Sequence, residues 1–267
     1  MFAIIKKFSL SFIVLNILIL QSLKADILFY YTAAILPSVV SSQKEFETVL
    51  YDNFNAYDST VWRKADWNNG DPFYNGWCPE QVSFENGVMS LTLEELDCND
   101  NDETHASGEY QTKETYKYGR YTARFIASDV NGTISSLFTY TGPHVGTDWD
   151  EIDMEILGKD STKIQVNYWR DGHEHPKLID LGFDASETMH TYSFVWHEAY
   201  IKWYVDGKLI HTVNENYNHD NDSLPINAGK IMLNLWAGVG IESWSGVYTN
   251  GTVAQAQYDY VRYEKFL

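Results

Sequence analysis

The sequence is poor in cysteine and in basic residues. Two of its 267 residues are cysteines, and 19 Lys and Arg stand against 37 Asp and Glu, for a net charge of −18. Nucleic-acid binding requires patches of Lys and Arg, so this balance argues against a nucleic-acid partner. It suits a neutral substrate and a soluble protein.

Long apolar runs are absent after the N-terminal part. Lys6 and Lys7 precede the run FSLSFIVLNILILQSL. A basic start followed by an apolar middle is typical of a secretory signal, which we expect over residues 1–25. An uncleaved membrane anchor is the alternative, because Leu23 is large for a cleavage site. No later segment is long and apolar enough to span a bilayer. We therefore expect a secreted, extracellular protein without stable membrane association after signal cleavage.

The scarcity of cysteine leaves two interpretations. In an exported protein, Cys78 and Cys98 could form one disulfide that closes a short loop. Two unrelated reduced thiols are the alternative. We favour the disulfide.

Helical stripes are also scarce, and alternation of polar and apolar residues dominates from Tyr51 onward. Examples are VSFENGVMSLTL, YGRYTARFIA, KIQVNYW and HTYSFVW. In YIKWYVDGKLIHTV, Asp206-Gly207 separates two alternating runs, which predicts a hairpin. Many short strands predict an all-β sandwich of two sheets. We expect one domain over residues 49–267, after a poorly specified lead-in at 26–48.

The acidic stretch DWDEIDMEILGKD, residues 148–160, combines crowded charge with apolar residues. On a strand, Glu151, Asp153 and Glu155 would point to one face, and the intervening apolar side chains to the other. A helix would separate Asp153 from the two glutamates. The neighbouring alternation favours the strand.

Three adjacent carboxylates repel one another, and this shifts their pKa values apart. Retaining glycoside hydrolysis uses such a split between a nucleophile and an acid/base about 5 Å apart. On a flat strand, residues i and i+4 are about 13 Å apart, so the sheet would have to be concave. A strand face exposed to solvent is the alternative. The many tryptophans in the same alternating segments favour a functional site. An EF-hand calcium loop fails, because its fifth position would be Ile152.

Several motifs resemble glycoside hydrolase family 16, and bacterial lichenases (endo-β-1,3-1,4-glucanases) in particular. They are SSLFTYTGPHVGTDWDEIDMEILGKD, LGFDASETMHTYSFVW, IKWYVDGKLIHT and KIMLNLWAGVGIESWSG. The resemblance covers roughly Tyr51 to Tyr263. It implies a concanavalin-like β-jelly roll of two curved antiparallel sheets, which agrees with the alternation.

The resemblance also implies roles for the carboxylates. Glu151 would be the nucleophile, Glu155 the general acid/base and Asp153 the helper between them. The expected reaction is retaining hydrolysis of mixed-linkage β-1,3-1,4-glucan by double displacement. No cofactor would be needed for catalysis, and a monomer is expected.

The resemblance also implies a set of sugar-binding residues, which are aromatic or polar. Aromatic rings match the apolar faces of sugars, and polar groups match their hydroxyls. Core packing is the alternative for each ring. The expected residues are Asn69, Glu109, Phe138, Tyr140, Trp149, Asn167, Trp169, Asn234, Trp236 and Trp244.

Relatives in this family often carry a structural calcium ion on the convex side, away from the cleft. The resemblance places its ligands at the backbone carbonyls of Ala56 and Gly87 and the side chain of Asp259. One carboxylate is a weak sequence signal for a calcium site.

Two departures from the lichenase pattern stand out. The positions of the lichenase disulfide fall at Asn75 and Ser107, so a bridge between the two cysteines would be a different one. Gln111 stands where lichenases have an arginine near the cleft. The surrounding segment ASGEYQTKETYKYGRYTARF is similar to glycanases that trim bacterial exopolysaccharides. Laminarin or an exopolysaccharide is therefore the alternative substrate, and a transglycosylase or a non-catalytic sugar-binding jelly roll are the alternative functions.

Overall fold

The computed structural model describes residues 45–98, 104–215 and 223–267. The expected signal at 1–25 and the lead-in up to residue 44 lie outside the described residues. The first strand, β1, spans Phe46–Asp52 and so begins within the end of the expected lead-in. No helix in the described ranges is long and apolar enough to cross a membrane.

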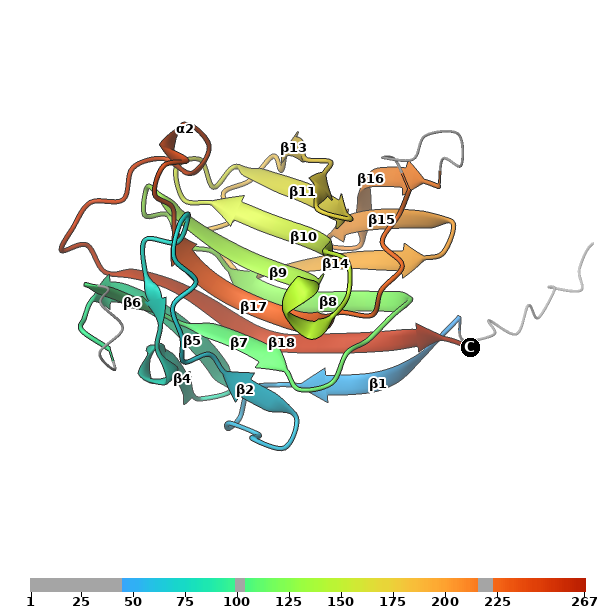
Figure 1. The fold of residues 1–267 in the computed structure, drawn as a ribbon, viewed down its shortest axis with the longest axis horizontal. Coiled ribbons are helices and arrows are strands. Elements are labelled where there is room, and N and C mark those ends of the chain that lie inside the picture. The colour runs from blue at the N-terminus through green and yellow to red at the C-terminus, as the bar shows by residue number, and fades with distance from the viewer. Residues whose placement is uncertain (1–44, 99–103, 216–222) are drawn as a thin grey trace, which may run out of the picture. The chain divides into compact units, whose positions relative to one another are not determined.

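Two twisted sheets form the domain (Figure 1). The first has the order β16-β15-β14-β8-β18-β5-β6-β3, with β1 paired to β18 and β4 to β5. Its further strands are β3 (Gly76–Trp77), β4 (Val82–Glu85), β5 (Val88–Glu95), β6 (His105–Ser107), β8 (Gly119–Ile126), β14 (His190–His197), β15 (Tyr200–Val205), β16 (Lys208–Asn214) and β18 (Ala254–Phe266).

The second sheet has the order β12-β11-β10-β9-β17-β7-β2, with β13 paired to β11. Its strands are β2 (Trp62–Lys64), β7 (Glu109–Thr112), β9 (Thr133–Thr141), β10 (Asp150–Leu157), β11 (Lys163–Arg170), β12 (His173–Glu174), β13 (Lys177–Asp180) and β17 (Lys230–Ala237). Pairing is antiparallel except between the short β3 and β6. The helical segments are short: η1 (Pro79–Gln81), η2 (Pro143–Val145) and α2 (Glu242–Ser245). This architecture confirms the predicted all-β jelly roll.

The core lies between the two sheets and follows the alternation of the sequence. Ile152, Met154 and Ile156 of β10 are fully buried there. Polar contacts also cross the core: Trp203 Nε1 of β15 donates to the Asp153 carbonyl oxygen at 3.1 Å. Tyr258 of β18 donates its hydroxyl to the Ser136 carbonyl oxygen at 2.9 Å. The core therefore fixes the position of β10 from behind.

The predicted hairpin is confirmed between β15 and β16. Asp206 and Gly207 have φ values of 49° and 75°. Two successive positive φ values are those of a type I′ turn, whose twist matches that of the flanking strands. Glycine adopts this conformation without strain, and aspartate tolerates it.

The predicted disulfide between Cys78 and Cys98 is also confirmed, with the Cα atoms 6.0 Å apart. The positions that would hold the lichenase bridge carry hydrogen bonds to β17 instead. Asn75 Oδ1 accepts from the backbone N–H of Ala237, and the Ser107 hydroxyl donates to the carbonyl oxygen of Leu235. The same corner of the fold is thus stabilised in two ways: by the bridge and by buried polar contacts.

Removing the bridge should destabilise the protein. The two cysteines are 20 residues apart, so their crosslink lowers the entropy of the unfolded chain. For the double variant Cys78→Ser/Cys98→Ser, we expect the free energy of unfolding to fall by about 2–4 kcal/mol. Urea denaturation of the variant and of the wild type measures this difference. Dithiothreitol should destabilise the wild type but not the variant, and equal sensitivity of both would contradict the prediction.

Candidate active site

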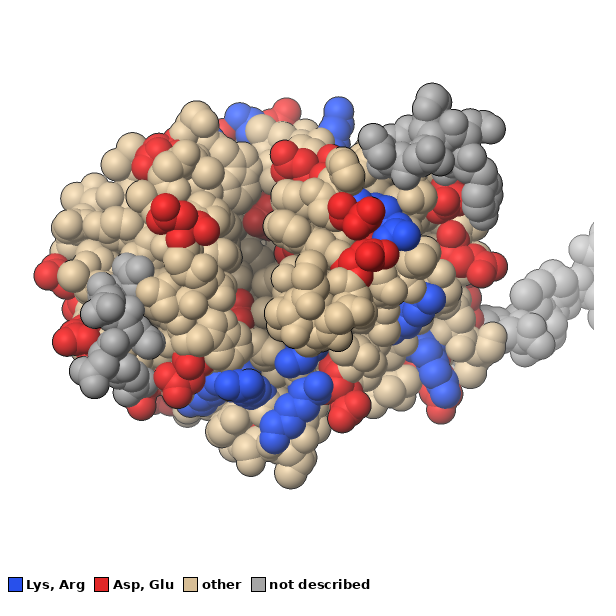
Figure 2. Space-filling model, in the orientation of Figure 1, with Lys and Arg blue, Asp and Glu red and all other residues tan. Residues whose placement is uncertain are grey.

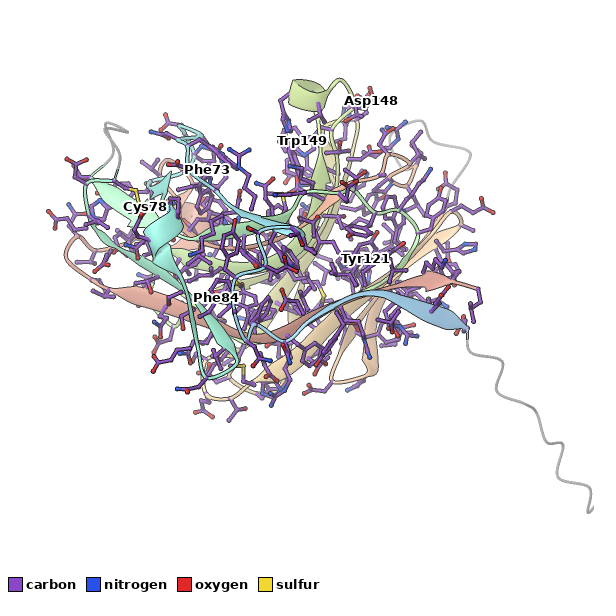
Figure 3. The ribbon with its side chains drawn as sticks, turned by 90° about the horizontal axis from the view of Figure 1, so that it is seen from below. Phe73, Cys78, Phe84, Tyr121, Asp148 and Trp149 are labelled. Atoms are coloured by element: carbon purple, nitrogen blue, oxygen red, sulfur yellow. A yellow bond between two sulfur atoms is a disulfide. The ribbon has the colours of Figure 1, made fainter. Side chains whose placement is uncertain are left out.

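Three carboxylates of β10 face one cleft. Glu151, Asp153 and Glu155 line a cavity of ≈ 730 Å³, while the residues between them point to the core. Figure 2 shows this face of the molecule hollowed at its centre, with acidic side chains inside the hollow. In the view from below, Phe73 and Trp149 lie on the two sides of the opening (Figure 3). The alternation predicted from the sequence therefore places all three carboxylates in one site.

Strands β9 and β11 flank β10 and set the neighbours of each carboxylate. The registered pairs are Glu151 with Tyr140 and Trp169, Asp153 with Phe138 and Asn167, and Glu155 with Ser136 and Gln165. Paired residues on adjacent strands point to the same face of a sheet. Each carboxylate consequently lies beside aromatic rings or polar side chains that can contact a sugar.

Glu151 lies beneath an aromatic pair. Trp149 Nε1 donates a hydrogen bond to Glu151 Oε2 at 2.6 Å. The indole of Trp149 stacks on that of Trp169, with ring centroids 4.4 Å apart. Burial raises the pKa of Glu151 to about 7, and the hydrogen bonds from Trp149 and Asp153 oppose this rise. These donors stabilise the charged form of Glu151 within an apolar wall.

Glu155 lies at the other end of the triplet and is held by an amide. Gln165 Nε2 donates to Glu155 Oε2 at 3.1 Å, and Trp244 Nε1 donates to Gln165 Oε1 at 2.8 Å. Burial, with a further contribution from the charge of Glu151, raises the pKa of Glu155 to about 8, and the hydrogen bond from Gln165 opposes this rise. Glu155 is therefore mainly protonated at neutral pH.

Asp153 lies between the two glutamates. Burial raises the pKa of Asp153 well above its usual range, and the charges of both glutamates add to this rise. A hydrogen bond with Glu151 raises the Asp153 pKa and lowers that of Glu151, which places the shared proton on Asp153. Asp153 is thus a neutral donor to an ionisable neighbour.

A fourth buried carboxyl group comes from β7. Burial raises the pKa of Glu109 to about 7. Asn234 Nδ2 and Gln111 Nε2 donate to the carboxylate of Glu109 at 3.3 and 3.2 Å and oppose this rise. Asn234 Oδ1 is buried and has no hydrogen-bond partner among the described residues. A ligand hydroxyl could provide that missing partner.

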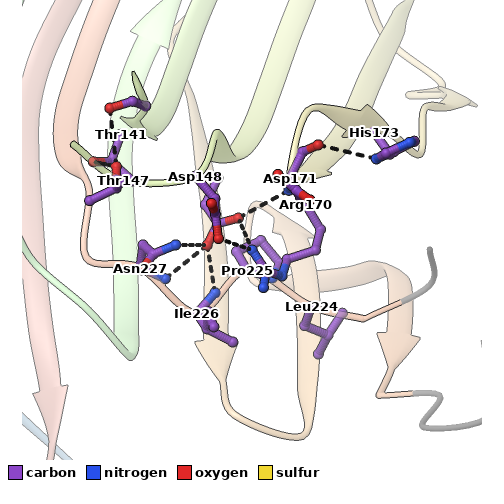
Figure 4. Close-up of polar contacts among 12 residues, drawn as sticks. Thr141, Thr147, Asp148, Arg170, Asp171, His173, Leu224, Pro225, Ile226 and Asn227 are labelled. Carbon is purple, nitrogen blue, oxygen red and sulfur yellow. Dashed lines mark hydrogen bonds and ion pairs between the residues drawn. The ribbon is translucent and has the colours of Figure 1, made fainter. Parts of the chain in front are cut away.

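Asp150 anchors the start of β10 on its core face through contacts with Arg170, Ile226 and Asn227, which Figure 4 labels. Its Oδ2 accepts hydrogen bonds from the backbone N–H of Ile226 at 2.8 Å, and from the backbone and side chain of Asn227 at 2.8 and 2.9 Å. Its Oδ1 accepts from Arg170 Nη1 at 3.1 Å and from the backbone N–H of Asp171 at 3.4 Å. A buried carboxylate with this many donors ties three segments together immediately before Glu151.

Most of the expected sugar-binding residues line the cleft. Those in its wall are Asn69, Glu109, Phe138, Tyr140, Trp149, Asn234 and Trp236. Three others are not among the residues that line this cavity, but each neighbours or contacts a residue that does or a residue bonded to Glu155. Asn167 is beside Asp153 and accepts from the backbone N–H of His175, Trp169 stacks on Trp149, and Trp244 lies 5.9 Å from Trp236 and contacts Gln165.

Several residues of the site are not predicted by the sequence patterns. The cleft wall also contains Arg63, Trp67, Phe73, His144 and Lys230. They lie on β2, on β17 and in connecting segments, where no carboxylate pattern marks them. Asp150 did carry a signal, because the alternation of β10 places it on the core face, where a charge requires partners.

The buried carboxyl groups predict a dependence of stability on pH. Glu109, Glu151 and Glu155 have pKa values of about 7, 7 and 8, against an ordinary value of 4.5. Between pH 4.5 and 8, the folded protein therefore binds more protons than the unfolded chain. The free energy of unfolding should consequently fall as the pH rises through this range. Urea denaturation at several pH values measures the slope.

Glu155→Gln should flatten this slope, and the exposed-site control Glu47→Gln should leave it unchanged. Identical slopes for the wild type and Glu155→Gln would contradict the assigned pKa shifts.

Comparison with known proteins agrees with this geometry. The sequence model of glycosyl hydrolases family 16 matches residues 69–262. A beta-glucanase of Acetivibrio thermocellus is 46% identical over 211 residues, which are 79% of this chain and 60% of that protein. The chain thus spans about three fifths of the length of this relative. A beta-glucanase of Bacillus subtilis is 45% identical over 223 residues, covering 80% of this chain and 86% of that protein.

Solved structures give the same result. A prokaryotic beta-1,3-1,4-glucanase (lichenase) from a mouse hindgut metagenome superposes with a TM-score of 0.76 at 40% identity, covering 82% of this chain and 99% of that one. The beta-glucanase of Bacillus licheniformis superposes with a TM-score of 0.73 at 43% identity, covering 80% and 96%. A laminarinase catalytic domain from Thermotoga maritima, at 22% identity, shares the fold. With a family match over most of its length and a jelly roll whose cleft holds three alternating carboxylates, this chain belongs to glycosyl hydrolases family 16.

Proposed function

We propose that this protein is an endo-β-glucanase that hydrolyses mixed-linkage β-1,3-1,4-glucan with retention of configuration. One observation carries the proposal: Glu151, Asp153 and Glu155 line a single cleft together with aromatic rings. The printed activities of the similar beta-glucanases and of the lichenase support the choice of substrate.

The pKa shifts support a division of roles in the first step. Glu151 is the nucleophile, because Trp149 and Asp153 donate to its carboxylate. Glu155 is the general acid, because its pKa of about 8 keeps it protonated. The Glu151 carboxylate attacks the anomeric carbon while Glu155 transfers its proton to the leaving glycosidic oxygen. One C–O bond breaks and an ester bond to Glu151 forms.

The second step reverses the role of Glu155. The ester removes the charge of Glu151, and that charge was one cause of the raised pKa of Glu155. The pKa of Glu155 therefore falls in the intermediate, and its carboxylate can accept a proton from water. The water oxygen attacks the anomeric carbon, and the ester bond to Glu151 breaks. Asp153 remains the donor that stabilises Glu151 as a leaving group.

The first test is the product pattern. Barley mixed-linkage β-glucan should yield small oligosaccharides, whereas laminarin, carboxymethylcellulose and succinoglycan should not be cleaved. Glu151→Ala should lower kcat by at least about 10³-fold, because the nucleophile is lost, and azide should partly restore turnover. Sizing of the products by chromatography measures both effects, with Glu47→Ala as the control.

Equal, mild losses in Glu151→Ala and Glu155→Ala would contradict the assigned roles. Cleavage of laminarin or succinoglycan in place of mixed-linkage glucan would retain the mechanism and change the substrate. Gln111, which lines the cleft beside Glu109, would then be the first residue to exchange. Redistribution of chain lengths without new reducing ends would indicate a transglycosylase. Binding without cleavage would indicate a sugar-binding module.

We also propose a structural calcium ion at Ala56, Gly87 and Asp259. Asp259 lies at a bulge in β18, and the adjacent Tyr258 pairs with Met89, which places Asp259 near Gly87 at the start of β5. Gly87 lies close to two further oxygen atoms, because a Cβ atom at this position would be 3.3 Å from Asn55 Oδ1 and 3.8 Å from the carbonyl oxygen of Asn53. The Asp259 carboxylate accepts from Arg124 Nη1 at 2.5 Å, so an ion would share this carboxylate with the guanidinium. Hard oxygen ligands of this kind suit calcium, with water completing its coordination.

Calcium should stabilise the folded protein if this site binds it. Stabilisation by about 1 kcal/mol would raise Tm by roughly 2–4 °C for a domain of this size. Calorimetry with calcium chloride and with EDTA measures the shift. Asp259→Asn should abolish the shift and the control Asp180→Asn should retain it. A shift that survives in Asp259→Asn would place the ion elsewhere.

We further propose that the chain is exported and acts as a monomer. The signal-like residues 1–25 and the disulfide between Cys78 and Cys98 support export, because disulfides persist in oxidising compartments.

A further inference from the structure

Positive charge gathers at one end of the cleft of this acidic protein. Figure 2 shows Lys and Arg side chains below the hollow, over the region of β2 in Figure 1. Two cations, Arg63 of β2 and Lys230 of β17, line the cleft itself. The net charge of the chain is −18, so a cationic end of the substrate cleft is a local reversal of the overall field.

Three neighbouring strands bring these cations together. Arg63 of β2 is registered directly opposite Gln111 of β7, and residues so paired share one face of the sheet. Lys230 of β17 donates from Nζ to Gln111 Oε1 at 2.7 Å. Gln111, at the position where lichenases have an arginine, thus lies between two cations.

Arg63 has no anionic partner in the described part of the chain. Its guanidinium lies 4.8 Å from the ring centre of Trp67, and among the described residues it forms no salt bridge. Trp67 in turn donates from Nε1 to Asn69 Oδ1 at 3.0 Å. The indole therefore holds a planar cation against the cleft wall and leaves its N–H edges available.

Lys230 has an anionic neighbour in Glu109, whereas the contact found for Arg63 is the ring of Trp67. The charge of Glu109 favours the charged form of Lys230, but burial and the charge of Arg63 both lower the pKa of Lys230. Two like charges in one cleft repel each other, and an anion bound between them would relieve this repulsion. A neutral glucan offers no such anion.

We propose that Arg63 and Lys230 form a subsite for a carboxylate-bearing sugar unit, such as a uronic acid, within the glucan chain. Four strand spacings of about 4.8 Å separate β2 from β10, or roughly 19 Å. The charged sugar would therefore lie several units from the cleaved bond. This inference rests on the proposed glucan hydrolysis and extends its substrate class.

The test compares neutral barley β-glucan with the same polymer after oxidation of a fraction of its C6 hydroxyls to carboxylates. The readout is the ratio of kcat/KM for the carboxylated polymer to kcat/KM for the neutral one. In Arg63→Gln this ratio should fall by about five-fold or more, because a charge-assisted contact is lost. Arg63→Lys should retain part of the preference for the carboxylated polymer. Added salt should lower the ratio for the wild type.

The matched control is Lys202→Gln. Lys202 is a cation over the ring of Tyr200, on β15 of the other sheet. The Lys202→Gln substitution changes the net charge by the same amount as Arg63→Gln, but at a position away from the cleft. An unchanged ratio in Arg63→Gln, or an equal fall in Lys202→Gln, would overturn the proposal.

Binding separates failure of this inference from failure of the proposed hydrolysis. Calorimetric titration of the Glu151→Ala protein with carboxylated and neutral oligosaccharides of equal length needs no turnover. Tighter binding of the carboxylated ligand that is lost in Glu151→Ala/Arg63→Gln supports the subsite. Equal affinity for the two ligands overturns it, whether or not the wild type cleaves either polymer.

Discussion

The burial of repelling carboxyl groups on one face of β10 is the constraint on which the site depends. Water would solvate and separate these charges, whereas the cleft raises the pKa values of Glu151, Asp153 and Glu155. Such an arrangement is unfavourable unless the strand is fixed by other contacts. The opposite face of β10 provides them, with three fully buried apolar side chains and the five-donor contact of Asp150. The contacts on the core face of β10 thus offset the unfavourable burial of carboxyl groups on its cleft face.

The same strand register gives each carboxyl group a different environment. The Trp149 indole and the protonated Asp153 stabilise charge on Glu151, while Glu155 has one amide donor and its pKa is raised by the charge of Glu151. Two glutamates in one strand can thus differ in protonation at the same pH. The difference comes from β9 and β11 and from the segments that carry Trp149 and Trp244, since the side chains themselves are identical.

The ends of the cleft are built from other elements than its centre. β2, the segment of Trp67 and Phe73, and the start of β17 contribute the residues that lie far from β10. Gln111 accepts a hydrogen bond from Lys230 and lies opposite Arg63. The positive charge at this end of the cleft therefore comes from β17 and β2, whereas Glu151, Asp153 and Glu155 all come from β10.

The sequence by itself determined the strand character of the segment Asp150–Leu157, the common face of its three carboxylates and the turn at Asp206-Gly207. These are local consequences of a two-residue period and of positive φ values, so they need no knowledge of distant contacts. Motif resemblance added the family and many residues of the cleft wall. Only the tertiary structure decided that Trp169 stacks on Trp149, that Asp150 accepts hydrogen bonds from the backbone of Ile226 and Asn227, and that Arg63 lies opposite Gln111. Each of these depends on the order and register of strands far apart in the chain, which local periodicity does not encode.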